Sequence, residues 1–257
     1  MLSWYQCYFI MIKGATHEIR ILHTAAVSPA LHVADCAYNT QQIIAAMRVQ
    51  AVAGTKLLCL PEFTLTGYTC SICFCRKHCA AAPRMLIQIL DASKELDVVT
   101  LVGLPMRHNG KLYNCAAVVC KGQLLGLVPK TYLPNYGRVL RRRHFVPGPK
   151  DAFEITFAGQ RTLFGTNLLF ACREMPEFVL GVEICEDLWA PVPPSCSHAL
   201  AGATVVANLS ASDETVGKAA YRRELVAGQS ARLLCGYVYA DAGHGESTTD
   251  MTLPPTI

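Results

Sequence analysis

The sequence alternates short, strongly apolar runs with longer segments whose apolar residues recur at helical spacing. Residues 38–53 place Ile43, Ile44 and Met47 on one helical face and end at Gly54, and the apolar run 57–60 follows directly. A continuous apolar run of this length is typical of a strand that is buried on both faces. The pairing of helix and buried strand therefore predicts an α/β fold in which helices cover a sheet.

The same alternation continues through the rest of the chain. Lys121 and Gly122 form a turn between two apolar runs, which predicts a hairpin and hence a mixed sheet. Further helices are expected at 81–96 and 216–233, and further strands at 18–22, 98–104, 113–119, 124–128, 178–184, 203–208 and 235–240. With no long linker between them, we expect an N-terminal extension over residues 1–17 and one domain over residues 18–257.

Composition restricts the class of protein. The 257 residues are 52% hydrophobic and 16% charged, which fits a compact soluble domain. The opening apolar stretch is too short to cross a bilayer and has no basic segment before it, so we expect no membrane contact and a cytoplasmic protein. A net charge of +4 is small for this length and predicts no nucleic-acid partner. The 13 cysteines are expected to be reduced core residues, Cys115, Cys120 and Cys235 among them.

Three chemically active side chains each follow a predicted strand. Glu62 and Lys130 come after apolar runs that a proline closes, and Cys185 comes directly after the run 178–184. Taken singly, such residues are usually rim charges or inert packing. Together they supply a base for a thiol, a cation for a developing oxyanion and the thiol itself, which is what attack on an amide requires.

A second cluster of soft ligands lies at Cys70, Cys73, Cys75, His78 and Cys79. Structural zinc sites usually take two ligand pairs from separate turns a dozen or more residues apart. Five candidates within ten residues do not match that spacing, so the sequence predicts no metal site.

The segments PEFTLTGYTC, VPKTYLPNYG and GVEICEDLWAPVPPS closely resemble the nitrilase (carbon–nitrogen hydrolase) superfamily. LPNYG, ICEDLW and the segment from NLSASDETVGK to GESTTD are similar to the amino-terminal glutaminase domain of glutamine-dependent NAD synthetases. The resemblance covers about residues 18–250. It implies a four-layer α-β-β-α sandwich, truncated at its C-terminus, with Glu62, Lys130 and Cys185 as the catalytic triad.

The resemblance also implies a reaction and its participants. Glutamine would be hydrolysed to glutamate and ammonia, with Glu62 as the base and with Lys130 and the Glu186 N–H at the oxyanion. This step would need no cofactor; ATP and Mg²⁺ would belong to a synthetase domain that is absent here, so an ammonia-dependent synthetase is an expected partner. The superfamily also implies a homo-oligomer. Glutamine would be held by Tyr136, Glu186, Trp189, Ser212 and Lys218.

Two departures from the family pattern keep other functions open. Arg138 and Arg141 stand where the family usually has acidic residues, including a second supporting glutamate, so activity is expected to be reduced. The chain also stops at Ile257, where the family continues with further strands. The alternatives are a free-standing amidase for another small amide and an inactive domain retained for assembly.

Overall fold

A computed structural model of the 257-residue chain describes residues 8–12, 21–69, 72–136, 139–140, 144–243 and 246. At 8–12, 72–79, 135–136 and 139–140 it describes the backbone alone.

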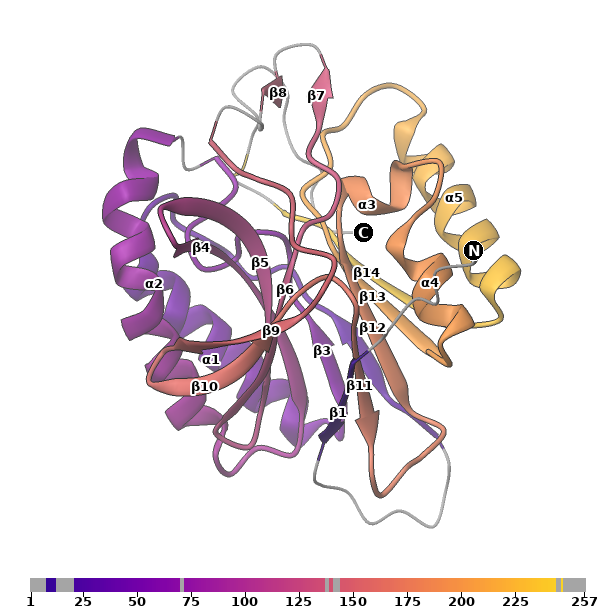
Figure 1. Ribbon diagram of the computed structural model, residues 1–257, viewed down its shortest axis with the longest axis horizontal. Helices are drawn as coiled ribbons and strands as arrows, with labels where there is room; N and C mark the ends of the chain where they lie inside the picture. Colours follow the sequence, from indigo (N-terminus) through magenta and orange to yellow (C-terminus); the bar gives the residue numbers. More distant parts are fainter. Residues whose placement is uncertain are drawn as a thin grey trace.

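Two sheets form the centre of the molecule (Figure 1). The larger has seven strands in the order β2 (Thr24–Ala26), β3 (Leu57–Cys59), β4 (Val99–His108), β5 (Lys111–Cys120), β6 (Gln123–Pro129), β10 (Gln160–Phe164) and β9 (Phe153–Phe157). The smaller has five, in the order β1 (Tyr8–Ile12), β11 (Leu168–Cys172), β12 (Val179–Ile184), β13 (Val205–Leu209) and β14 (Gly236–Ala240). A separate short pair joins β7 (Asn135–Tyr136) and β8 (Val139–Leu140).

Helices cover the outer faces of both sheets, which completes a four-layer α-β-β-α sandwich and confirms the expected fold class (Figure 1). Helices α1 (Cys36–Val52) and α2 (Ile72–Ser93) lie against the seven-stranded sheet, with buried side chains of both contributing to one core cluster. On the five-stranded sheet, α4 (Pro194–Leu200) contacts β12 and α5 (Lys218–Leu233) contacts β14. The single turn α3 (Glu186–Trp189) follows β12 directly.

The core between the two sheets explains why the central strands are apolar on both faces. Leu101 and Val118 of the larger sheet share a buried cluster with Phe170 and Leu180 of the smaller one. At the contact, a Cβ added to Gly126 would lie 2.9 Å from the Phe170 ring, so only glycine lets the sheets approach this closely here. A strand that is buried on both faces needs apolar residues at consecutive positions, and the sequence shows such runs at these strands.

Helix α1 shows how local signals set an element's ends. The Asp35 carboxylate accepts the Tyr38 N–H at 3.0 Å, which caps the first turn. Ile43, Ile44 and Met47 are buried on one face against the sheet. Gly54 follows the helix at φ +79°, a conformation that glycine adopts readily. The helix predicted at 38–53 is therefore confirmed to within two residues at its start.

The N-terminal part of the chain differs from expectation. Of the strand expected at 18–22, residues 18–20 lie outside the described part of the structure, and residues 21–23 are outside any strand, with Ile21 64% exposed. Strand β2 lies at the edge of the larger sheet. Strand β1 lies in the region expected to be an extension and pairs parallel to β11 over five residues, Tyr8 opposite Leu168. A short apolar segment that pairs with the edge of a sheet gains backbone hydrogen bonds. This arrangement is more favourable than lying unpaired on the surface.

Cys115, Cys120 and Cys235 are buried in the core, as predicted. Within the described ranges, none of the helices is long and apolar enough to cross a membrane.

Candidate active site

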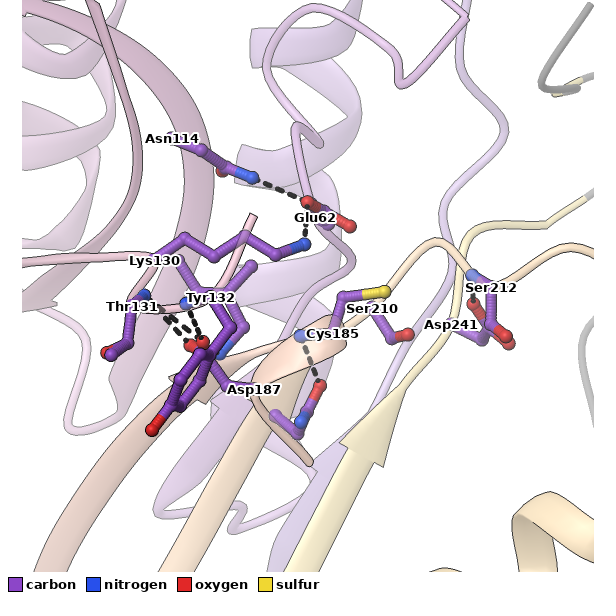
Figure 2. Close-up of polar contacts among 12 residues, drawn as sticks. Glu62, Asn114, Lys130, Thr131, Tyr132, Cys185, Asp187, Ser210, Ser212 and Asp241 are labelled. Atoms are coloured by element: carbon purple, nitrogen blue, oxygen red, sulfur yellow. Dashed lines mark hydrogen bonds and ion pairs between the residues drawn. The ribbon is translucent and has the colours of Figure 1, made fainter. Parts of the chain in front are cut away.

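The three candidate side chains meet at the ends of three strands that come from both sheets (Figure 2). Glu62 follows β3 and Lys130 follows β6 in the larger sheet, while Cys185 follows β12 in the smaller. Lys130 Nζ lies 2.8 Å from Glu62 Oε1, and each side chain is only 2% exposed. The charges of Glu62 and Lys130 both act on the Cys185 thiol. Fold topology therefore brings together residues that lie far apart in the sequence.

The two carboxylate oxygens of Glu62 have different surroundings. Oε1 accepts the Lys130 ammonium at 2.8 Å and the Asn114 amide at 2.5 Å. Oε2 is buried, and no donor among the described residues reaches it. A buried carboxylate oxygen without a donor is costly unless a reacting group uses it. Glu62 thus has one oxygen fixed in place and one free to accept a proton.

The backbone of the Glu62 loop is held to the opposite sheet. The Glu62 N–H donates to the Ser210 carbonyl at 3.1 Å, and the Ser210 N–H donates to the Ala240 carbonyl at 2.7 Å. Gly103 of β4 gives this loop its room, because a Cβ there would lie 2.4 Å from the Phe63 nitrogen and 2.5 Å from the Pro61 carbonyl oxygen. The carboxylate is therefore positioned by backbone contacts on both sides.

Cys185 sits at a strained turn between β12 and α3. Its φ of 45° and ψ of −98° are unfavourable for a residue with a Cβ. Asn208 Oδ1 accepts the Cys185 N–H at 2.9 Å, and the Cys185 carbonyl accepts the Leu188 N–H at 3.1 Å. Backbone strain of this kind persists where surrounding contacts fix it, and it is concentrated at functional sites.

Burial and charge set the protonation states of the site. Burial raises the pKa of the Cys185 thiol to about 12, and the positive charge of Lys130 lowers that pKa by a smaller amount. For Lys130, burial lowers the pKa, but the negative charges of Glu62 and its neighbours outweigh burial and hold the pKa above its ordinary value. At neutral pH the resting site therefore holds a neutral thiol beside an ammonium, so the thiol needs a base before it can attack.

Asp187 ties the lysine segment to the cysteine turn. Its Oδ1 accepts the N–H groups of Thr131 at 3.1 Å and Tyr132 at 2.7 Å, directly after Lys130 (Figure 2). Its Oδ2 accepts the Ile184 N–H at 2.9 Å, directly before Cys185. One buried carboxylate thereby fixes the relative position of two of the three candidate residues.

Comparison with known proteins agrees with this geometry. The carbon–nitrogen hydrolase family matches residues 23–242, which is most of the chain and includes all three residues. The chain belongs to the carbon–nitrogen hydrolase family.

Relatives within this family include larger enzymes. The chain is 42% identical over 250 residues to the glutamine-dependent NAD(+) synthetase of Mycobacterium tuberculosis, covering 97% of this chain and 35% of the relative. A crystal structure of a glutamine-dependent NAD(+) synthetase from Cytophaga hutchinsonii is similar with a TM-score of 0.75 and 32% identity, covering 87% of this chain and 36% of that one. The chain thus spans about a third of the length of these relatives.

A smaller enzyme shares the fold at lower identity. An amidase from a Nesterenkonia species has a TM-score of 0.66 at 17% identity, covering 98% of this chain and 82% of that chain. This likeness shows a common fold.

The residues expected to hold a substrate lie on α3, in the loop after β13 and at the start of α5. Glu186 and Trp189 are the first and last residues of α3, directly after Cys185. Lys218 Nζ lies 5.3 Å from the centre of the Trp189 ring, so the structure brings these two together. Ser212 is buried in the loop after β13, where its N–H donates to Asp241 at 2.8 Å. The Tyr136 side chain lies outside the described part of the structure.

Several polar residues that sequence reasoning missed support the site. Asn114 binds Glu62, Asn208 binds the Cys185 backbone, and the Ser210 hydroxyl lowers the pKa of the Cys185 thiol. Asn114 and Asn208 each interrupt an otherwise apolar strand, and both are buried, at 4% and 0% exposure. A polar residue in a strand buried on both faces needs a specific partner, and that signal could have identified them.

Some sequence expectations concern residues without a described side chain. Arg138, Arg141 and the cluster from Cys70 to Cys79 are all outside the described side chains. Within the part of the chain whose side chains are described, no group of three or more histidine, cysteine, aspartate or glutamate residues could hold a metal ion.

Proposed function

We propose that this chain hydrolyses the side-chain amide of glutamine to glutamate and ammonia, with Cys185 as the nucleophile. The observation that carries the proposal is the buried pair of Glu62 and Lys130 beside the Cys185 turn, with one Glu62 oxygen left without a donor. The names of the similar NAD synthetases support glutamine as the substrate. The span from residue 18 to 257 is proposed to act as one hydrolase domain.

The first half of the reaction forms a thioester. Glu62 Oε2 takes the proton of the Cys185 thiol, and the sulfur attacks the carboxamide carbon. Lys130 and the Glu186 backbone N–H stabilise the negative charge that develops on oxygen. The tetrahedral adduct then breaks its carbon–nitrogen bond, the Glu62 proton passes to nitrogen, and ammonia leaves.

The second half releases glutamate by the reverse use of the same groups. Glu62 Oε2, deprotonated by the departure of ammonia, removes a proton from water, and the hydroxide attacks the thioester carbon. The adduct expels the sulfur, which recovers its proton from Glu62. Glu62 carries out every proton transfer in the cycle, Lys130 supplies the positive charge, and Cys185 forms and breaks the thioester.

The ammonia would serve a synthetase that makes an amide. We propose that this activity resides in a separate synthetase domain or subunit, that ATP and Mg²⁺ belong to that reaction, and that the chain acts as a homo-oligomer in the cytoplasm. The 35% coverage of the Mycobacterium relative supports a division of labour between two regions of such enzymes.

The test is the release of ammonia and glutamate from L-glutamine by the purified chain and by Cys185→Ala. The proposal predicts equal amounts of both products from the parent chain and none from the variant. Equal release by both proteins would contradict the role of Cys185. Absence of release from a folded parent chain would favour the inactive-domain alternative.

A further inference from the structure

A chain of buried hydrogen bonds ends at the backbone of the nucleophile. Asn208 Oδ1 accepts the Cys185 N–H at 2.9 Å, and Asn208 Nδ2 donates to the Tyr237 hydroxyl at 3.3 Å. The Tyr237 hydroxyl in turn donates to Glu183 Oε1. Glu183 and Asn208 are only 1% and 0% exposed. Three neighbouring strands, β12, β13 and β14, thus contribute one side chain each to a single chain of bonds.

The far end of this chain fixes the direction of every bond in it. Glu183 Oε2 accepts the Ser195 N–H at 2.9 Å, so both oxygens of the carboxylate act as acceptors. Tyr237 therefore gives its one hydrogen to Glu183, and its oxygen is left to accept from the Asn208 amide. An amide whose nitrogen faces Tyr237 turns its oxygen toward Cys185. Glu183 thereby determines which end of the Asn208 side chain meets the Cys185 N–H.

The Cys185 turn needs this anchor because its backbone is strained. A φ of 45° with a ψ of −98° persists only where surrounding contacts hold it. Asn208 fixes the peptide group before Cys185. The Leu188 N–H donates to the Cys185 carbonyl at 3.1 Å and fixes the peptide group after it, which carries the Glu186 N–H. Loss of either anchor would let the turn relax and would rotate the Glu186 N–H.

Fold stability does not account for a carboxylate at Glu183. Burial raises the pKa of this carboxyl, and the hydrogen bonds from Tyr237 and Ser195 offset part of the rise. The rest of β12 consists of apolar residues and one glycine. An apolar residue at a buried position is often as stabilising as a buried charge, or more so. A buried carboxylate two residues before the nucleophile is better explained by its effect on the turn.

We propose that Glu183 and Tyr237 are positioning residues, which act through Asn208 to hold the strained turn at the nucleophile. Held in this conformation, the turn aims the Glu186 N–H at the oxyanion of the proposed hydrolysis. The inference rests on the proposed function. It concerns the two steps in which negative charge develops on the substrate oxygen, namely formation and hydrolysis of the thioester.

The test compares a reaction of Cys185 that forms an oxyanion with one that does not. Glutamine hydrolysis passes through tetrahedral oxyanions, whereas alkylation of the thiol by iodoacetamide displaces iodide from a saturated carbon. Both are measured for the parent chain, Tyr237→Phe, Asn208→Ala and the variant with both changes. The readouts are kcat and KM for L-glutamine and the rate of Cys185 alkylation by peptide mass spectrometry. Tyr113→Phe, which removes a phenol oxygen from the core against α1 and α2, is the matched control.

The variants are expected to lose turnover and to keep the reactivity of the thiol. Tyr237→Phe should lower kcat roughly 10- to 100-fold, the loss expected when a group at the oxyanion is displaced. KM and the alkylation rate should stay within about threefold of the parent values. Asn208→Ala should behave alike, and the combined variant should lose no more, because Tyr237 acts only through Asn208. Tyr113→Phe should match the parent in all three quantities.

Three results would overturn the inference while leaving glutamine hydrolysis intact. They are a parent kcat in Tyr237→Phe, losses of kcat that add in the combined variant, and an alkylation rate that falls as far as kcat. If Tyr237→Phe fails to fold, as judged by thermal unfolding, its combination with Glu183→Gln, which also removes the buried charge, takes its place with the same expected split. If Asn208→Ala fails to fold, that split alone decides. A parent chain that does not hydrolyse glutamine would refute the proposed function and the inference with it.

Discussion

At the scale of single residues, the asymmetry of Glu62 is the main feature of the site. Lys130 and Asn114 both bind Oε1 and thereby orient the carboxylate, while Oε2 has no donor among the described residues. The Cys185 thiol has its pKa raised to about 12 by burial, so it holds its proton at neutral pH. Glu62 has an oxygen available to take a proton, and the Cys185 thiol needs such a base before it can attack. The two residues are therefore complementary.

Replacing Glu62 by glutamine tests that complementarity. Glu62→Gln can keep an acceptor for Lys130 and Asn114 but cannot take a proton. We expect kcat for glutamine to fall roughly 10²- to 10⁴-fold, the usual contribution of a positioned base. Steady-state rates measure the effect, and the unfolding temperature shows whether the variant is folded. A folded variant with the parent rate would rule out Glu62 as the base.

At the scale of elements, Asp187 connects the segment after β6 to the turn after β12 through three backbone N–H groups. Burial raises the pKa of its carboxyl to about 7, and the Lys130 charge and the backbone N–H groups offset part of this rise. The carboxyl therefore binds its proton more tightly in the folded than in the unfolded chain. The raised pKa of Asp187 makes its full contribution to the free energy of unfolding below about pH 4, and this contribution is lost as the pH rises through 7.

Asp187→Asn removes this titration and leaves a neutral side chain. The free energy of unfolding of the parent chain, relative to that of the variant, should therefore decrease between pH 4 and pH 7. The expected decrease is on the order of 4 kcal/mol, because the pKa of the Asp187 carboxyl is raised from 3.8 to about 7. Urea unfolding of both proteins at several pH values gives the difference directly. A difference that is constant with pH would show that Asp187 does not titrate as described.

Several elements that are buried on both faces were predictable from the sequence, although the buried strand β11 was missed. The apolar run 57–60 predicted β3, and the turn at Lys121 and Gly122 predicted the β5–β6 hairpin, because strands buried on both faces leave a plain pattern. The β9–β10 hairpin mixes exposed and buried positions and was missed. Strand β2 has only three residues, which are too few to show the alternation of apolar and polar residues that is typical of a strand.

The candidate site was predictable for a different reason. The spacing of Glu62, Lys130 and Cys185 in the sequence does not show whether their side chains lie close together in space. The family resemblance alone indicated that they form one site. Asn114 and Asn208 stand out as polar residues within apolar strands. The groups that they and Asp187 bind come from separate strands, however, and no local pattern identifies those partners.

At the scale of the whole molecule, the site exists only when the two sheets are packed together. Glu62 and Lys130 come from the seven-stranded sheet and Cys185 from the five-stranded one, and the N–H of Glu62 crosses to the Ser210 carbonyl. The apolar core between the sheets, with Phe170 seated against Gly126, holds these strand ends at their working separation. Packing of the sandwich is therefore a condition for the proposed chemistry.

The most direct test of the central claim is to find which residue attacks the amide carbon. A glutamine analogue that carries a diazoketone in place of the carboxamide alkylates the nucleophile that meets it, and peptide mass spectrometry identifies the modified residue. The account predicts a single adduct on Cys185 among the 13 cysteines, formed in step with loss of glutamine hydrolysis and prevented by excess L-glutamine. An adduct on another residue, or glutamine hydrolysis that persists after complete labelling of Cys185, would contradict it.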